Sequence, residues 1–324
     1  MCDLAQIPNM TRDLGRIATE LSMIFPELGE IRSINVLGEG FRSMVVETPD
    51  GDVFKIAKNW EASAGLVKEA QILPLIGDRL STSVPYPLWQ AGASNHFPFG
   101  VLGYPKLPGK PLHPGVLSPQ SSAEIAKGVA EFLLSLHGMR LDPSTASMLP
   151  GTDVRRFELH SLRNTVLPVL RELLQPHEYR AVDHWWSSFL SDPRMRQFTP
   201  ALQHGDLWYE NILVDSDNRL TGVIDFENLA LGDPAQDFAT QLHLGRDFAV
   251  AVLDHYQAAG GILDEGLRYR MQRLWELREF GGMRLAIHFE DQIEFNDAIR
   301  KLRNGPILDT ATRRETTIWQ PPAR

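Results

Sequence analysis

The residues best suited to chemistry are two carboxylates and one amide at short, regular spacing. Asp206 is followed by Asn211 after four intervening residues, and Asp225 lies fourteen residues beyond Asn211. Phosphoryl transfer requires a carboxylate that accepts the proton of the attacking hydroxyl, and it requires hard oxygen ligands that hold Mg²⁺ on the phosphates. The pattern of acid, amide and acid is therefore typical of phosphoryl transfer on Mg²⁺.

The residues between these groups favour a β-hairpin. Residues 212–214 and 220–224 are two short β-prone runs, and the turn-forming residues 215–218 lie between them. Asn211 would stand near the start of this hairpin and Asp225 at its end. We therefore expect the hairpin to bring the amide and the second acid together.

Three sequence blocks carry a resemblance to a known family. Their order and spacing resemble the aminoglycoside phosphotransferase family, which is related to choline kinases and macrolide kinases. The resemblance implies an α+β, protein-kinase-like bilobal fold, with nucleotide bound between a β-rich lobe and a helical lobe. It covers most of the chain loosely and residues 204–239 tightly. The blocks are His204-Gly205-Asp206-x4-Asn211, Ile224-Asp225-Phe226-Glu227 and Gly232-Asp233-Pro234-Ala235-x-Asp237.

The resemblance implies a role for each matching residue. Asp206 resembles the catalytic base, and Asn211 and Asp225 resemble the Mg²⁺ ligands. His204 resembles the residue that buttresses the catalytic loop. Asp237 resembles the buried acid that holds this loop through backbone hydrogen bonds. For any one of these acids taken alone, a carboxylate in a cap or turn is an equal alternative.

A glycine-containing segment near the N-terminus is a candidate for phosphate binding. Gly38 and Gly40 lie between two β-prone runs, where backbone N–H groups without a neighbouring side chain would approach phosphate oxygens. Ser43 resembles the small polar residue that the family places against a phosphate. An ordinary hairpin turn explains the two glycines about as well.

Lys55 resembles the lysine that contacts the α- and β-phosphates. It lies on a β-prone run, and Glu69 follows on a predicted helix, where an ion pair would orient the lysine. Lys58 is a rival, but it lies at the end of the run. Lys68, beside Glu69, leaves open a solvated helix face.

The segment that joins the two lobes is expected to bind the base of the nucleotide. Tyr104 is a bulky residue at its start or an ordinary core residue. Pro105 offers a carbonyl but no N–H, so Lys106 or Leu107 would donate to the base. This departs from the more common hinge of the family, and it leaves the choice between ATP and GTP open.

The family places the acceptor between the catalytic loop and the C-terminal helices. Trp208 and Tyr209 follow Asp206 and would form an aromatic wall there, although core packing is equally compatible. Several acids in this region would bind the ammonium groups of an aminoglycoside, whereas scattered surface carboxylates are the plainer interpretation. These acids are Glu227, Glu276, Glu279, Glu290 and Asp291.

The surrounding pattern predicts the elements that position these residues. Up to residue 104 we expect strands at 31–36, 43–48, 53–57, 88–91 and 99–104, with one helix at 61–76. Residues 105–111 are rich in Pro and Gly and form the hinge, which leaves 1–104 as the nucleotide-binding lobe. Residues 112–324 form the helical lobe. It contains a possible capping box at Ser121 and Glu124, helices over much of 157–192, and helices again from about 235.

Composition limits the classes of partner. The chain has 324 residues and a net charge of −9, which argues against nucleic acid and suits a cationic small-molecule acceptor. Cys2 is the single cysteine, so no intramolecular disulfide is expected. We find neither a signal-peptide pattern nor an apolar run that would cross a membrane, and we expect a cytoplasmic protein. The oligomeric state and the role of the tail around Trp319 stay open.

These observations predict an O-phosphotransferase that uses Mg²⁺ and ATP or GTP on a hydroxyl of a small molecule, with an aminoglycoside antibiotic as the first choice. The alternatives are a kinase for a macrolide, choline, a sugar or an amino-acid alcohol such as homoserine, and a nucleotide-binding pseudokinase. Choline would need an aromatic cage. A protein kinase is disfavoured, because Asp225 and Ala235 are too close in sequence to enclose a long activation segment.

Overall fold

The computed structural model describes residues 13–309, and these residues divide into two compact units. The first contains residues 13–78 and 84–107, and the second contains residues 79–83 and 108–309. Residues 79–83 join the second unit because Ser83 forms a bridge to Gly222 and the Ser81 N–H donates to the Ser135 hydroxyl. Cys2 and Trp319 lie outside the described residues.

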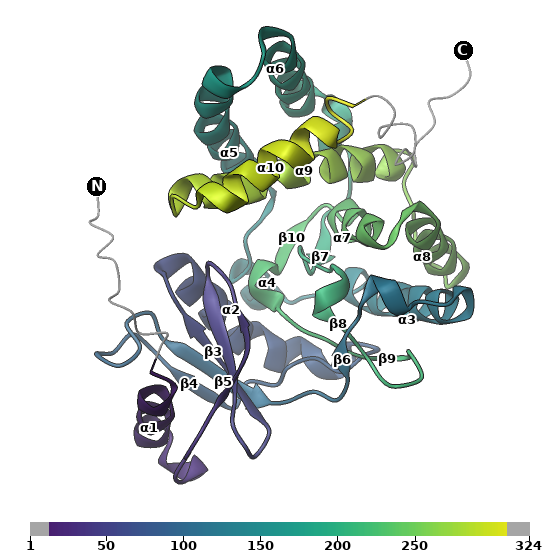
Figure 1. Cartoon of the computed structure of the whole chain (residues 1–324). Helices are drawn as coiled ribbons and strands as arrows, with labels where there is room; N and C mark the ends of the chain where they lie inside the picture. The colour runs from purple at the N-terminus through teal and green to yellow at the C-terminus, as the bar shows by residue number, and fades with distance from the viewer. Residues whose placement is uncertain (1–12, 310–324) are drawn as a thin grey trace. The chain divides into compact units, whose positions relative to one another are not determined.

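The first unit is built on a five-stranded antiparallel sheet with the strand order β1-β2-β3-β5-β4 (Figure 1). The expected hairpin is present between β2 and β3, where Gly51 takes the positive φ of 87° that the turn requires. The strands are β1 (Asn35–Glu39), β2 (Ser43–Glu47), β3 (Asp52–Ala57), β4 (Trp89–Ala91) and β5 (Val101–Pro105).

The first strand was predicted too early in the chain. The apolar residues of 31–36 suggested a strand, but Ile31 and Ile34 instead bury their side chains in the core of the first unit. Strand β1 begins at Asn35 and runs on through Gly38, and all five of its residues are exposed. Burial of the two isoleucines therefore competes with strand pairing and shifts the edge strand toward the C-terminus.

Two α-helices complete the first unit, α1 (Leu14–Ile24) and α2 (Trp60–Ile76). The sequence analysis expected α2 and missed α1. Helix α1 is capped by Asp13, whose carboxylate accepts from the Arg16 N–H, and it packs Ile17 and Leu21 into the core. Helix α2 is capped by Asn59 in the same way.

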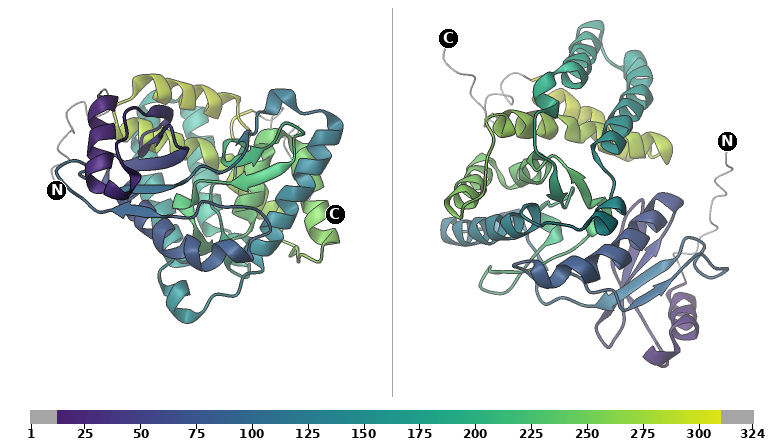
Figure 2. Two further views of the ribbon diagram at one scale, coloured as in Figure 1. Left: turned by 90° about the horizontal axis from the view of Figure 1, so that it is seen from below. Right: turned by 180° about the vertical axis from the view of Figure 1, so that it is seen from behind.

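The second unit is mainly helical. Figure 1 shows α5, α6, α9 and α10 grouped together, and the view from behind in Figure 2 shows the same grouping. Their shared core contains Trp185, Trp186, Phe280 and Met283, while α3 packs along α8. The helices are α3 (Pro119–His137), α4 (Pro143–Ser147), α5 (Thr152–Leu173), α6 (Pro176–Ser191), α7 (Ala235–Thr240), α8 (Arg246–Ala258), α9 (Leu267–His288) and α10 (Gln292–Asn304).

The capping box expected at Ser121 and Glu124 is wrong. Helix α3 starts one turn earlier, because Ser118 caps it by accepting from the Ser121 N–H, and Pro119 occupies the first helical position. Across residues 13–309, the helices are all too short or too polar to span a lipid bilayer.

Two small sheets in the second unit flank the connecting residues 204–211 and 224–229. The hairpin expected at 212–224 is present as β8 (Ile212–Val214) and β9 (Leu220–Val223), and β6 (Lys110–Pro111) pairs with β8. Strands β7 (Ala201–Gln203) and β10 (Ala230–Gly232) form the second sheet. Residues 204–211 leave β7 and enter β8, and residues 224–229 connect β9 to β10.

Candidate active site

A buried carboxylate fixes the start of the loop that contains Asp206. Asp237 of α7 is fully buried, and its two oxygens accept from the backbone N–H groups of His204 at 2.9 Å and Gly205 at 2.7 Å. Gly205 has a φ of 84°, and a Cβ there would lie 2.5 Å from the Asn228 carbonyl oxygen. The loop therefore requires glycine at 205, and the hydrogen bonds expected from Asp237 are present.

His204 links the loop to the end of β9. Its ring is fully buried on Phe226, with Nε2 3.0 Å from the Ile224 carbonyl oxygen, while Nδ1 accepts from the Asp206 N–H at 3.3 Å. Since Nδ1 accepts, the proton belongs on Nε2, which donates to Ile224. A neutral imidazole in this tautomer ties the backbone at Asp206 to the segment that precedes Asp225.

The hairpin brings the chain at Asn211 against the chain at Asp225. The Ile224 N–H donates to the Asn211 carbonyl at 3.0 Å, and Ile212 is paired with Val223. The Asn211 side chain is buried, and its Nδ2 donates to the Asp206 carbonyl at 2.9 Å. This bond orients the amide and leaves Oδ1 as the atom that would accept or ligate.

Asp225 has an unusual backbone conformation. Its φ of 67° and ψ of 69° lie in the left-handed region, which most side chains avoid and which Asp tolerates better than most. The residue turns the chain from β9 into a short 3₁₀ helix, Phe226–Asn228. A carboxylate held in a sparsely populated conformation is a frequent feature of functional sites.

A second acid lies beside Asp225. Carboxylate oxygens of Asp225 and Glu227 lie within 4.8 Å of each other, and Glu227 is buried. Two acids at this separation repel one another unless a cation or proton intervenes, and hard oxygen ligands suit Mg²⁺. Glu227 was expected among the acceptor residues, and its carboxylate lies beside that of Asp225. The donor set of the loop is therefore compatible with Mg²⁺.

The first unit contains the expected ion pair between Lys55 and Glu69. Lys55 Nζ lies 2.8 Å from Glu69 Oε1, and both side chains are almost completely buried on β3 and α2. The rival Lys58 instead bonds Glu39 Oε1 at 2.7 Å and the Gly40 carbonyl at 2.9 Å. Lys55 is therefore the lysine that the helix glutamate orients.

Gly38 and Gly40, which precede Ser43 in the sequence, have open space around them. A Cβ at Gly38 or Gly40 would meet nothing within 4 Å, and neither residue has a positive φ. Packing and turn geometry therefore do not explain these glycines. Gly40 donates its N–H to the Ser43 carbonyl at 3.0 Å, at the point where β1 passes into β2.

The connecting segment after β5 has one of its two candidate donors already in use. The Lys106 N–H donates to the Gly51 carbonyl oxygen at 2.8 Å. The Leu107 N–H is then the remaining candidate donor to a nucleotide base. Tyr104 is buried on β5 opposite Val53.

An aromatic cluster adjoins the loop. The ring of His243 lies 5.8 Å from Trp208, 6.2 Å from Tyr209 and 4.9 Å from Trp275, measured between centroids. Desolvation by these neighbours, with the positive charge of Arg278, lowers the pKa of His243 to about 4, so the ring is neutral at physiological pH. The Arg278 guanidinium stacks 3.7 Å above Trp275. The sequence analysis identified neither His243 nor the contact of Trp275 with it, because the rings come from three distant segments of the chain.

Two of the acids expected at the acceptor have structural bonds instead. Glu276 is buried, and its Oε2 accepts from Trp185 Nε1 at 2.6 Å and from Arg273 at 2.7 Å. Asp291 caps α10 through the N–H groups of Ile293 and Glu294. These bonds give both residues a role in the fold.

Of the other two expected acids, one is paired and one is exposed. Glu279 pairs with Arg278 at 2.8 Å, and burial raises the pKa of its carboxyl. Glu290 is exposed, beyond the end of α9.

The two units together define a phosphotransferase with a kinase-like fold. The first has a buried lysine–glutamate pair on a five-stranded sheet, and the second has an ordered loop with an acid, an amide and a second acid. Residues 33–273 match the model of the phosphotransferase enzyme family (APH), and the chain belongs to that family. The protein is a small-molecule kinase.

Similar proteins support this assignment. Viomycin phosphotransferase of Streptomyces vinaceus is 29% identical over 231 residues, which cover 67% of this chain and 75% of that protein. The GDP and kanamycin complex of APH(2")-IIia has a TM-score of 0.79 at 24% identity, covering 88% of this chain and 96% of that one. Macrolide 2'-phosphotransferase type I has a TM-score of 0.67 at 22% identity, covering 88% and 96%. The expected fold is confirmed.

Proposed function

We propose that the protein transfers the γ-phosphoryl group of ATP or GTP to a hydroxyl of a small cationic antibiotic, of the aminoglycoside type or related to viomycin. The reaction would take place in the cytoplasm, where nucleoside triphosphates are available. The observation that carries the proposal is the ordered loop of the second unit, in which Asp237 fixes the backbone before Asp206 and Asn211 is oriented by the Asp206 carbonyl.

In this proposal Asp206 is the catalytic base. It orients the acceptor hydroxyl and takes its proton as the oxygen attacks the γ-phosphorus. The bond between the γ-phosphorus and the bridging oxygen breaks, and the nucleoside diphosphate leaves with the electron pair. The His204 bond to the Asp206 N–H holds the loop during this step.

Asn211 and Asp225 are proposed to hold Mg²⁺, with Glu227 close to Asp225. Bound Mg²⁺ would neutralise charge on the phosphates. Lys55, fixed by Glu69, would contact the α- and β-phosphates. The open backbone at Gly38 and Gly40 and the hydroxyl of Ser43 are proposed to lie against the phosphates. Tyr104 and the Leu107 N–H would contact the base.

The acceptor is proposed to bind against the aromatic cluster that follows Asp206. Trp208 and Tyr209 offer planar faces for a sugar or peptide ring, and a neutral His243 does not repel an ammonium group. Glu279 and Glu290 remain the candidate acids for such a group. A similar protein is a viomycin phosphotransferase and a similar structure binds kanamycin, and both of these antibiotics are cationic, which supports this choice.

A macrolide is the second candidate acceptor. Arg278 stacks on Trp275 and pairs with Glu279, so it occupies an acid that an ammonium group would need, which favours a less cationic acceptor than an aminoglycoside. The similarity to macrolide 2'-phosphotransferase type I is in line with it. An acceptor panel distinguishes the two.

The test is nucleoside diphosphate release with ATP or GTP and Mg²⁺, measured separately with viomycin, kanamycin, gentamicin, a macrolide and choline. We expect acceptor-dependent release with viomycin or an aminoglycoside, and a new phosphate-ester signal in the ³¹P spectrum of the product. Release with the macrolide alone would favour the second candidate. Nucleotide binding without turnover on any acceptor of a broad panel would contradict both and would favour a pseudokinase.

A further inference from the structure

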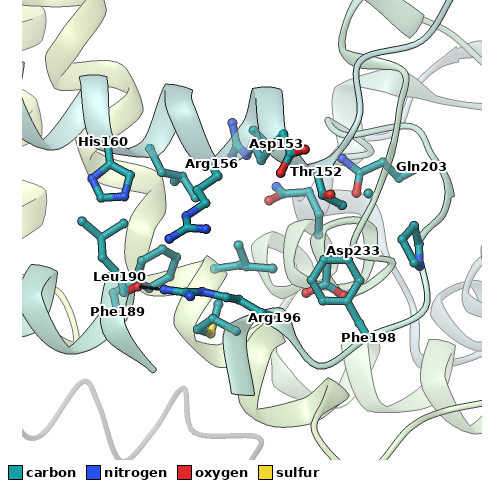
Figure 3. Close-up of a pocket in the computed structure, with 17 residues that line it drawn as sticks. Thr152, Asp153, Arg156, His160, Phe189, Leu190, Arg196, Phe198, Gln203 and Asp233 are labelled. Atoms are coloured by element: carbon teal, nitrogen blue, oxygen red, sulfur yellow. Dashed lines mark hydrogen bonds between the residues drawn. The ribbon is translucent and has the colours of Figure 1, made fainter. Parts of the chain in front are cut away.

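The second unit contains a cavity that the proposed reaction does not use. It has a volume of about 330 Å³ and lies between the N-terminal part of α5, the end of α6 and α9 (Figure 3). Of the residues that line it, none is Asp206, Asn211 or Asp225. A single water occupies about 30 Å³, so the space is much larger than a packing defect.

The cavity has an extended apolar wall. Two phenylalanines and four aliphatic side chains form a surface that would contact a planar hydrocarbon body. These residues are Leu159, Phe189, Leu190, Met195, Phe198 and Leu274.

Two arginines converge on the same space. Figure 3 shows Arg156, from α5, pointing into this space, and Arg196, from the 3₁₀ helix Pro193–Arg196, lying along the opposite side of it. Among the residues that the structure describes, no acid pairs with either of them, and Arg196 donates only to the Leu190 carbonyl at 2.8 Å. Two guanidinium groups of like charge, directed at one space, are a favourable site for an anion between them.

The other charges at the cavity limit the charge of the ligand. Asp233 shares the buried Arg270 with Asp264, and Arg155 is paired with Glu158. Among the described residues, the remaining charged side chains at the cavity are Arg156, Arg196 and Asp153, and these three carry an excess of one positive charge. A monoanion matches this balance, whereas a polyphosphate would meet Asp153.

A buried amide also lines the cavity. Gln203 lines the cavity and is only 7% exposed, and its Oε1 is buried with no hydrogen-bond partner among the described residues. Buried amides are normally bonded, and an unpaired one is costly unless a ligand or water completes it. A water enclosed beside a bound ligand would supply the missing bond.

From this convergence of an apolar wall, two unpaired arginines and an unpaired amide, we propose that the cavity binds a small amphiphilic monoanion with a planar apolar body and a carboxylate. The carboxylate would lie between Arg156 and Arg196, and the body would pack on Phe189 and Phe198. This site is separate from the proposed phosphotransfer, so its test needs no turnover.

The test is calorimetric titration of the full chain with 2-naphthoate, using the neutral 2-naphthamide as the matched probe. We expect one naphthoate per chain and weaker binding of the amide. Arg156→Ala should weaken naphthoate binding about tenfold or more, because a charge-assisted bond is lost, and should leave amide binding unchanged. Arg156 is exposed, so this variant should fold normally. The control Arg180→Ala removes the same charge from an exposed site on α6 and should bind like the wild type.

A second measurement locates the ligand. Crystals soaked in 6-bromo-2-naphthoate should show the anomalous signal of bromine between α5 and α6, and the larger side chain in Leu190→Trp should abolish it. Equal affinity of the wild type and Arg156→Ala for naphthoate, no measurable binding, or bromine at another site would each overturn the proposal.

Discussion

His137 and Asp237 are one hundred residues apart in the sequence, and their side chains meet with Nε2 3.1 Å from Oδ2. The same carboxylate oxygen accepts from the His204 N–H. The last residue of α3 therefore contacts the acid that orders the loop of Asp206.

The contact predicts a stability effect. His137→Phe keeps the aromatic packing against Phe238 and Tyr256 but removes the bond to Asp237. We expect the free energy of unfolding to fall by about 1.5–3 kcal/mol, the range for a hydrogen bond to a charged group. Urea denaturation measures it. The control His184→Phe changes an exposed histidine on α6 and should leave the midpoint nearly unchanged, and an equal effect of both variants would refute the role of the contact.

Asp206→Asn tests the base. The amide preserves the size of the side chain but cannot accept the proton, so turnover should fall by about 10²–10⁴-fold while the fold and nucleotide binding persist. Acceptor-dependent diphosphate release measures turnover, and a thermal shift with nucleotide measures binding. Asp217→Asn, in the exposed turn of the hairpin, is the matched control and should remain fully active. Undiminished turnover in Asp206→Asn would reject the assignment.

Asp225→Asn tests the metal site. Asparagine tolerates the left-handed conformation of this residue, so the backbone should be retained while one negative charge is lost. In the wild type, Mg²⁺ should increase the affinity for nucleoside diphosphate. In Asp225→Asn we expect this increase to be smaller by a factor of at least about ten, because a metal ligand is weakened. Titrations with Mg²⁺ and with a chelator separate this effect from binding of the nucleotide alone. An unchanged dependence on Mg²⁺ would remove Asp225 from the metal site.

The residues that sequence analysis located well are those whose relative positions are fixed by local structure. Asn211 and Asp225 are joined by one hairpin, and Lys55 and Glu69 occupy a strand and the helix that follows it. Spacing within such short units determines which side chains meet. The start of helix α3 was less predictable, because both Ser118, which precedes Pro119, and Ser121 have the residue type of an N-cap.

Long-range contacts could not be read from spacing. The rings of Trp208, His243 and Trp275 belong to three separate segments, and no local pattern links them. Glu276 had the residue type of a cation-binding acid, but tertiary packing turns it toward Trp185. The cavity at Arg156 and Arg196 likewise depends on how α5 lies against the end of α6.

The neutral His243 predicts a pH dependence of stability. Its pKa is lowered in the folded chain from 6.5 to about 4, so between these values the unfolded state binds more protons. The contribution of the neutral His243 ring to the free energy of unfolding is fully present above about pH 6.5 and is lost as the pH falls toward 4. Because the side chain of His243 is exposed despite its aromatic neighbours, solvent screens much of the effect.

His243→Gln cannot titrate in this range, so the midpoint of thermal unfolding should fall less between about pH 7.5 and about pH 5 in this variant than in the wild type. Thermal scans at the two pH values measure the difference. The control His184→Gln replaces an exposed histidine and should follow the wild type. If His243→Gln also follows the wild type, the aromatic cluster does not hold the imidazole neutral, and the case for a cationic acceptor beside it is weakened.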